Sequence, residues 1–452
     1  MRIVIIGAGT IGCEIIKNLA SDKHHITIVD DNKILIESLV EKYDIQGVVG
    51  NGASLDIQME AGMNHADVAI VVTHSDELNI FACMVAKKLG VKNTVARVRN
   101  PEYRQQIAEM QNELGISMIV NPELDTANEI FNLISLPAIV DIERFANGKV
   151  LLVEVAIDKD SNLVDETLIS IGQKFKTKIL ICAVQRGNEV VIPSGRFTIK
   201  EGDKICFTAQ AKDLRDFLTE ANIIKTPLRN IMIVGGNRVA YYLAKQLAQK
   251  KYKIKLIEKD MDNAEALSDK LDKVTVVCGP YMSHDVLMEE GIENIDVFVA
   301  LTDADEENVI ISMFANKMGI KRTITQIQGD DLYDMLDMAG IENNVSPKAI
   351  LADSISSYIR ALSNSRGSNV LSLYRLVKGQ VEALEFDAKN KHSKIYNKPL
   401  RSLKIKSNCL IACIIRNDRV IIPDGNTDIQ LGDHVVVVTT HKDFDDLSEI
   451  FI

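Results

Sequence analysis

Near the N-terminus, three glycines stand at the spacing GxGxxG, in the segment GAGTIG that contains Gly7, Gly9 and Gly12. The segment follows an apolar run and opens an amphipathic stretch, which is the context in which this motif binds a pyrophosphate. The first glycine permits a tight turn, the second lets the backbone approach a phosphate, and the third lets helix and strand pack closely. Free N–H groups at the helix start would bind the phosphates. A glycine turn kept only for packing is the alternative.

A carboxylate follows at the distance that such a site requires. Asp30 ends the next apolar run, ITIVD, 23 residues after Gly7. A carboxylate at this place accepts hydrogen bonds from ribose hydroxyls and repels a 2′-phosphate, which favours NAD(H) over NADP(H). The motif and the acid together predict a dinucleotide or adenine-nucleotide site.

Further polar residues follow the later strands that the pattern predicts, at the sheet edge where ligands bind. The segment GNGAS at 50–54 leaves room for a flat base, although an ordinary strand–helix turn explains it as well. Thr73 and His74 follow the fourth expected strand, and no second acid or base accompanies the histidine as a proton relay. Arg97 and Arg99 would neutralise phosphates, and a solvated or paired arginine is the alternative.

The elements that must position these residues alternate between strand and helix. Short apolar runs are expected to form buried parallel strands at 3–6, 26–29, 68–72, 94–96 and 118–120. Helical stretches lie between them at 11–20, 77–89 and 101–110. This rhythm predicts a doubly wound parallel sheet with right-handed crossovers.

The plan recurs later in the chain at an offset of 228 to 230 residues. Residues 2–20 return at 230–248, residues 69–98 at 298–327, and residues 189–207 at 419–437. We therefore expect an α/β protein with two Rossmann-like domains, each followed by a small α+β module. The expected segments are a nucleotide-binding domain at 1–123, a helix at 124–140, a module at 141–225, a degenerate Rossmann-like domain at 228–347, a helix at 348–365 and a module at 368–452.

The two linking helices have an apolar face that must be buried. One alternative is packing on their own sheet, and the other is a crossover to a neighbouring subunit; the sequence leaves both open.

The second copy differs at the residues that matter for a nucleotide. The replacements are Gly9 by Asn237, Gly12 by Ala240, Asn51-Gly52 by Pro280-Tyr281, and Arg97 by Gln326. Glu258 keeps a carboxylate for a ribose, and Arg238 would reach a phosphate. We expect the second site to be degraded or re-specialised.

The composition argues against several classes of protein. With 46% hydrophobic and 25% charged residues, the 452-residue chain is globular, and its net charge of −11 argues against nucleic acid as the main partner. No apolar run approaches the roughly 20 residues that cross a bilayer, and the chain starts with a strand-like segment, so we expect a cytoplasmic protein without membrane insertion. The scattered His and Cys residues predict no metal site.

Taken together, the duplicated GxGxxG half, GNGAS, TxxDxxN, ARVRNPEY and IPxGxxxIxxGD resemble the RCK (regulator of potassium conductance) family. The tandem arrangement is similar to the peripheral NAD-binding subunits of Trk-type potassium uptake systems, and the resemblance covers essentially the whole chain. It implies a homotetrameric gating ring on the cytoplasmic face of the cell membrane, beneath a membrane K⁺-translocating subunit. It also implies NAD(H) in the first sheet, with ATP or ADP as competing ligands in some relatives, and ligand or dimerisation roles for the small modules.

The leading interpretation is thus a nucleotide-sensing regulator and not an enzyme, with no catalytic residues. An NAD-dependent dehydrogenase is the alternative, disfavoured because the small modules cannot serve as a usual substrate domain. A third interpretation is a nucleotide sensor that acts on another soluble protein. The residues expected to hold the nucleotide are Gly7, Ala8, Gly9, Thr10, Ile11, Gly12, Asp30, Asn51, Thr73, His74, Arg97 and Glu258.

Overall fold

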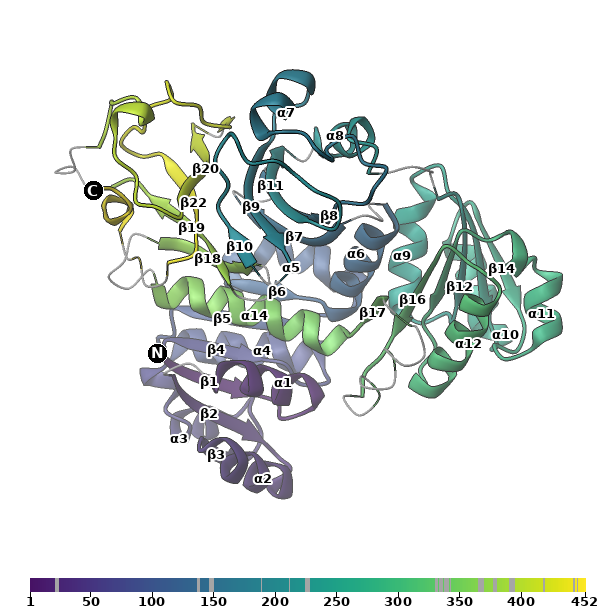
Figure 1. The fold of residues 1–452 in the computed structure, drawn as a ribbon. Coiled ribbons are helices and arrows are strands. Elements are labelled where there is room, and N and C mark those ends of the chain that lie inside the picture. Colours follow the sequence, from purple (N-terminus) through teal and green to yellow (C-terminus); the bar gives the residue numbers. More distant parts are fainter. Residues whose placement is uncertain are drawn as a thin grey trace. The chain divides into compact units, whose positions relative to one another are not determined.

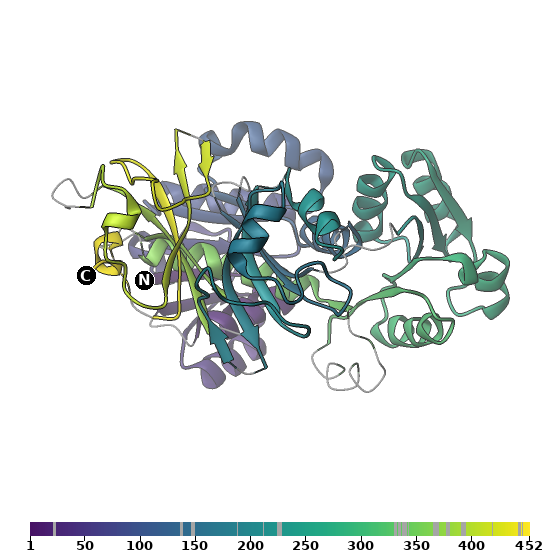
Figure 2. The ribbon, with the colours of Figure 1, turned by 45° about the horizontal axis from the view of Figure 1, so that its top comes forward.

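The computed structural model divides the chain into two compact units (Figures 1 and 2). One unit comprises Met1–Ser135 with Leu228–Ser356, and the other comprises Leu136–Pro227 with Ser357–Ile452. The structure describes residues 1–20, 24–135, 139–145, 150–187, 189–210, 212–223, 228–329, 332, 336, 341, 343–364, 370–376, 380–389, 395–417, 419–441, 444 and 446–452. Each unit contains both copies of one part of the repeat. The first unit holds the two six-stranded parallel sheets, and the other holds the two five-stranded antiparallel sheets.

The first sheet domain is a six-stranded parallel sheet in the order β3-β2-β1-β4-β5-β6. Its elements are β1 (Arg2–Ile6), α1 (Thr10–Leu19), β2 (His25–Asp30), α2 (Lys33–Tyr43), β3 (Gln46–Val49), α3 (Leu55–Glu60), β4 (Val68–Val71), α4 (Asp76–Lys88), β5 (Asn93–Arg97), α5 (Pro101–Leu114) and β6 (Met118–Val120). This strand order confirms the predicted doubly wound fold, in which ligands bind where the order reverses, between β1 and β4.

The second sheet domain repeats this order as β14-β13-β12-β15-β16-β17. Its elements are β12 (Asn230–Val234), α9 (Arg238–Ala248), β13 (Lys253–Glu258), α10 (Met261–Lys270), β14 (Val274–Cys278), α11 (His284–Glu289), β15 (Val297–Ala300), α12 (Asp305–Lys317), β16 (Arg322–Gln326) and β17 (Asn343–Val345). The central strands β12 and β15 are buried on both faces, which explains their continuous apolar sequence. The predicted duplication of the fold is confirmed.

The linking helices cross between the two sheet domains of the same chain. Helix α6 (Pro122–Ser135) buries Ala127, Ile130 and Ile134 in the core of the second sheet domain, beside α9 (Figure 1). Helix α14 (Pro347–Asn364) contacts α1 in return, since Asn18 Nδ2 donates to Asp353 Oδ1 at 2.9 Å. The two alternatives from the sequence were packing on the same sheet and crossing to another subunit, and the structure shows a reciprocal crossing within one chain.

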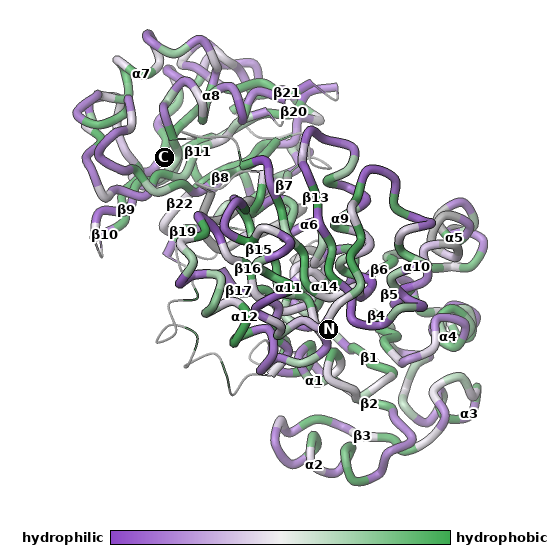
Figure 3. Tube along the Cα trace, turned by 90° about the vertical axis from the view of Figure 1, so that its right-hand side faces the viewer, coloured by the Kyte–Doolittle hydropathy of each residue, from purple (hydrophilic) through white to green (hydrophobic). Residues whose placement is uncertain are grey.

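The other unit contains two small modules with five-stranded antiparallel sheets. The first has β7 (Ile139–Phe145), β8 (Val150–Ala156), α7 (Leu168–Lys174), β9 (Leu180–Arg186), β10 (Glu189–Val191), β11 (Lys204–Gln210) and α8 (Leu214–Glu220). The second has β18 (Val370–Leu376), β19 (Val381–Asp387), β20 (Cys409–Arg416), β21 (Arg419–Ile421) and β22 (His434–Thr439). Figure 3 shows hydrophobic stretches around β8 and β9, and these strands contribute to an apolar core that the two sheets share.

An arginine–aspartate pair explains the GD motif in both modules. Asp203 is buried and accepts from Arg186 Nε at 2.8 Å and Nη2 at 2.7 Å. Asp433 accepts from Arg416 in the same way, at 2.9 and 2.8 Å. In the first module the pair joins the start of β11 to the end of β9, and in the second it joins the start of β22 to the end of β20. The motif therefore stabilises each module.

Candidate functional site

The glycine-rich loop of the first sheet domain has the geometry that its spacing predicts. Gly7 has φ 106°, in the left-handed region that favours glycine, and its N–H donates to Val29 O at 2.9 Å. A Cβ on Gly12 would lie 2.0 Å from the carbonyl oxygen of Gly7. The close approach of α1 to the loop therefore requires a glycine at position 12.

The N-terminus of α1 is open to a ligand. Gly9 is its N-cap residue, and no side chain of the described residues caps the helix. A Cβ on Gly9 would meet no described atom within 4 Å. The first N–H groups of a helix lack partners inside the helix and lie at the positive end of its dipole. Space and free donors thus coincide at Thr10 and Ile11, where an anion would bind.

The carboxylate of Asp30 is anchored beside this loop. Its Oδ2 accepts from the N–H of Ala8 at 2.7 Å, and its Oδ1 accepts from the N–H of Asn32 at 2.9 Å. The side chain is only partly buried. Each carboxylate oxygen has a second acceptor position, so Asp30 keeps the capacity to accept two ribose hydroxyls.

The GNGAS loop is fixed by a residue that sequence reasoning missed. Gln58, on α3, is fully buried, and its Nε2 donates to Gly52 O at 2.8 Å and to Ala82 O at 3.1 Å. Asn51 is exposed and accepts from the N–H of Ala53 at 2.9 Å. No local pattern marks Gln58, because its role depends on α3 facing α4.

The TxxDxxN segment joins the ends of β4 and β5. Asn79 Oδ1 accepts from the N–H of Thr73 at 2.9 Å, and its Nδ2 donates to Arg97 O at 2.9 Å. Asp76 accepts from the N–H of Arg99 at 2.9 Å. The segment therefore organises the edge of the sheet, and a direct contact of Thr73 with a nucleotide stays a prediction.

The second copy repeats these contacts. Asn308 Oδ1 accepts from the N–H of Thr302 at 2.8 Å, and its Nδ2 donates to Gln326 O at 3.0 Å. The recurrence of the segment in the sequence is thus explained by a structural requirement that both sheets share.

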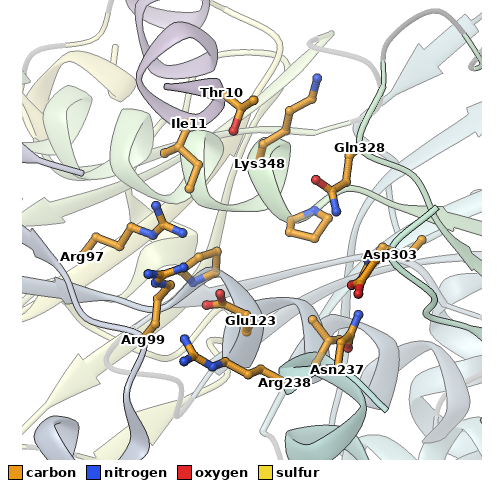
Figure 4. Close-up of a pocket in the computed structure, with 14 residues that line it drawn as sticks. Thr10, Ile11, Arg97, Arg99, Glu123, Asn237, Arg238, Asp303, Gln328 and Lys348 are labelled. Carbon is orange, nitrogen blue, oxygen red and sulfur yellow. The ribbon is translucent and has the colours of Figure 1, made fainter. Parts of the chain in front are cut away.

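A cavity of about 370 Å³ lies between the two sheet domains (Figure 4). It brings together Thr10, Ile11 and Arg97 of the expected site, whereas Asp30 and His74 do not line it. The other lining residues are Arg99, Pro122, Glu123, Asn237, Arg238, Val239, Asp303, Gln326, Gln328, Pro347 and Lys348. Four cationic side chains and two carboxylates thus face one space, which favours an anionic ligand.

The electrostatics at Arg97 point the same way. Burial, together with the positive charge of Arg99, lowers the pKa of the Arg97 guanidinium, and the charge of Glu123 offsets this only in part. Within the described part of the chain, Arg97 Nε and the buried Gln326 Oε1 have no hydrogen-bond partner. An anion in the cavity would relieve the repulsion between the two arginines.

His74 is exposed, and its carbonyl oxygen accepts from Arg99 Nη2. Within the described ranges, no cluster of three or more His, Cys, Asp or Glu residues has the arrangement of a metal site. The described helices likewise include none that combines the length and hydropathy of a membrane span.

Comparison with known proteins identifies the family. The TrkA-N domain matches residues 3–122 and 231–347, and the TrkA-C domain matches residues 152–221 and 388–452. The chain belongs to the TrkA family. The resemblance to tandem RCK proteins, inferred from the motifs, is thereby confirmed.

Full-length relatives support this assignment. The Trk system potassium uptake protein TrkA of Vibrio alginolyticus is 32% identical over 98% of this chain and 97% of its own length. The TrkA homolog of Archaeoglobus fulgidus is 28% identical, with 100% of both chains covered. These TrkA relatives are named for potassium uptake and not as dehydrogenases, in agreement with the expectation of a non-enzymatic protein.

Solved structures support the fold. The GsuK channel superposes with a TM-score of 0.65 at 18% identity, over 97% of this chain and 76% of the channel chain. A structure described as the GsuK channel bound to NAD gives a TM-score of 0.65 at 17% identity, with the same coverage. At this identity the likeness to the GsuK chains concerns the fold alone.

Proposed function

We propose that this protein is the nucleotide-sensing regulatory subunit of a potassium uptake system, and that its first sheet domain binds NAD(H). The observation that carries the proposal is the uncapped N-terminus of α1 at Gly9, next to the anchored carboxylate of Asp30. A pyrophosphate needs the first feature and a ribose needs the second. The names of the TrkA relatives and the NAD-bound GsuK channel support the same assignment.

In this proposal the pyrophosphate lies over Gly9 and accepts from the N–H groups at the start of α1. The ribose hydroxyls donate to Asp30, and the base lies near the GNGAS loop. Phosphates beyond the pyrophosphate would extend towards Arg97 and Arg99, which line the cavity. ATP and ADP would compete with NAD(H) because all of them contain the adenosine diphosphate moiety that Gly9 and Asp30 would hold, and a structure described as GsuK bound to ADP supports adenine nucleotides as ligands of this fold.

The regulatory step is a difference in affinity. A nucleotide shifts the partner between two states only to the extent that it binds them unequally. We propose that the chain forms a homotetramer on the cytoplasmic face of the membrane, where nucleotide binding opens or closes a K⁺-translocating subunit. Because α6 and α14 each pack on the opposite sheet domain, a shift of one domain is transmitted to the other.

Calorimetric titration of the full chain with NADH, NAD⁺, ATP and ADP tests the binding, and K⁺ flux in vesicles that contain the transporter tests the regulation. We expect saturable NADH binding, competition by ATP, and a nucleotide-dependent flux only when this protein is present. A folded protein that binds none of the four nucleotides would refute the proposal. Association with a soluble protein and not with membranes would favour the free-standing sensor.

The dehydrogenase alternative has a separate test. NADH incubated with the protein and a panel of keto acids and aldehydes should keep its absorbance, because the fold supplies the nucleotide site without a substrate domain. Steady oxidation that depends on the protein would favour the enzyme.

A further inference from the structure

The acidic residue that ends the second strand is held in the same way in both sheet domains. In the second domain, Glu258 Oε2 accepts from the N–H of Gly236 at 2.7 Å, and Oε1 accepts from the N–H of Asp260 at 2.8 Å. These contacts match those of Asp30 with two backbone N–H groups. In both domains, therefore, two backbone N–H groups hold the carboxylate at the end of the second strand.

Among the described residues, side-chain donors to this carboxylate are found in the second domain and not in the first. The hydroxyl of Tyr281 donates to Glu258 Oε1 at 2.8 Å, and Asn263 Nδ2 donates to Glu258 Oε2 at 3.2 Å. The first domain has Gly52 and Leu35 at the corresponding positions, and neither offers such a donor. One O–H and one N–H thus use acceptor positions of Glu258 that two ribose hydroxyls would need.

Burial separates the Tyr281–Glu258 contact from ordinary surface contacts. Glu258 is 4% exposed and Tyr281 is 7% exposed. Burial, followed by the hydrogen bond to Glu258, raises the pKa of the Tyr281 phenol, so the phenol stays protonated and acts as a donor. Lys259 Nζ lies 5.0 Å from the centre of the Tyr281 ring, which covers the ring on one side.

The phosphate end of the second domain is filled as well. Asn237 Oδ1 accepts from the N–H of Ala240 at 3.1 Å, and Nδ2 donates to Leu301 O at 2.8 Å. The Asn237 side chain therefore accepts from a helix N–H group that would otherwise donate to a phosphate oxygen. At the start of α1, Gly9 has no side chain that could accept from the equivalent N–H group.

We propose that the second sheet domain contains a latent adenosine-nucleotide site, which its own side chains fill. Tyr281 and Asn263 take the place of the ribose hydroxyls, and Asn237 takes the place of a phosphate oxygen. The inference rests on the proposed function, because it takes the first domain as the nucleotide-binding reference. Each chain then binds one nucleotide, and the second domain responds to it only through its packing with α6 and α14.

The test is the number of nucleotides bound per full-length chain, measured by calorimetry with NADH and with ADP. The variant Asn237→Gly/Tyr281→Gly removes the side chain at the phosphate end and the shorter of the two side-chain hydrogen bonds to Glu258, and it leaves only the 3.2 Å contact of Asn263. Its matched control Tyr281→Phe removes only the hydroxyl and keeps the ring in place. We expect one nucleotide per chain for the wild type and Tyr281→Phe, and two for the double variant. Addition of Glu258→Ala to the double variant should return the number to one.

A folded double variant that still binds one nucleotide would overturn the inference, and so would a wild-type chain that binds two. If the double variant does not fold, Asn237→Gly/Tyr281→Ala replaces it, and the expected result is a rise in melting temperature with millimolar ADP in an Asp30→Ala background. The absence of such a rise would count against the inference. If the wild type binds no nucleotide, the proposed function fails, whereas a gain of ADP binding that depends on Glu258 would still support the latent site.

Discussion

The two sheet domains share a strand order but differ in what meets the acidic residue at the end of the second strand. In the first domain, Asp30 is partly exposed beside an uncapped helix. In the second, Glu258 is buried and accepts from two side chains besides two backbone N–H groups. The comparison shows that two backbone N–H groups fix the carboxylate in both copies, whether or not side chains also donate to it.

The largest expected effect concerns this acid. Asp30→Ala should weaken NADH binding by about 1.5–3 kcal/mol, or roughly 10- to 150-fold, because hydrogen bonds to a charged group are lost. The matched change Glu258→Ala should leave the NADH affinity within about twofold and should lower the stability, since it leaves buried donors without an acceptor. Calorimetry and urea unfolding of the full chain measure both. Equal losses of NADH affinity in the two variants would break the comparison.

The next test makes the first domain resemble the second. Gly9→Asn should weaken NADH binding at least tenfold, about 1.4 kcal/mol, because the new amide would cap α1 in the place of the pyrophosphate. A Cβ at Gly9 meets no described atom within 4 Å, and φ at this residue is −64°, so the change fits without strain. The same cap should stabilise the free protein by up to about 1 kcal/mol.

A loss of NADH affinity together with a gain in the free energy of unfolding would distinguish this mechanism from simple damage to the fold by Gly9→Asn. Unfolding in urea without ligand and calorimetry with NADH give the two values. A variant that binds NADH with unchanged affinity would show that the helix terminus does not hold the phosphates.

These tests use the full chain because the structure gives a reason not to divide it. Helix α6 belongs to the first half by sequence, yet Ile130 and Ile134 lie in the core of the second sheet domain. An isolated half would expose these side chains to water. A loss of NADH affinity in such a half would then report unfolding as much as the quality of its site.

The sequence predicted the sheets, the glycine loop and the acid, because each depends on local spacing. The roles of Gly7 and Gly12 follow from a turn and a helix start a few residues apart. The contact of Tyr281 with Glu258 joins residues 23 positions apart, on elements whose approach only the folded sheet defines. The partner of α6 was equally hidden, because an apolar helix face does not specify which of two similar apolar sheets it covers.

The two small modules differ less than the two sheet domains, because both copies keep the same arginine–aspartate pair. Asp203→Asn and Asp433→Asn should each lower the free energy of unfolding by about 1–2 kcal/mol, since each weakens a bidentate bond to an arginine. Neither change should alter NADH affinity, because neither residue lies in a sheet domain. Urea unfolding of both variants gives the two losses, and a loss in one copy only would mean that the modules are less alike than their contacts indicate.

The Asp203 pair also has a pH signature. Burial alone would raise the pKa of this carboxyl, but Arg186 and the N–H of Lys200 hold it below its ordinary value. The contribution of the pair is therefore present above the unfolded pKa of about 4 and is lost as the pH falls through the folded value. The stability difference between the wild type and Asp203→Asn should shrink on acidification from neutral pH to below about 4.

The smallest expected effect concerns the cap of α9. Asn237→Ala should lower the free energy of unfolding by about 1 kcal/mol, because the N–H of Ala240 loses its side-chain acceptor. Asn237→Ser keeps a side-chain acceptor for the N–H of Ala240 and loses the bond to Leu301 O, so it should cost less. If Asn237→Ala unfolds at the wild-type urea concentration, the amide does not cap the helix. The inequality of the two domains would then rest on Tyr281 and Asn263 alone, and Gly9→Asn would lose its reason to weaken NADH.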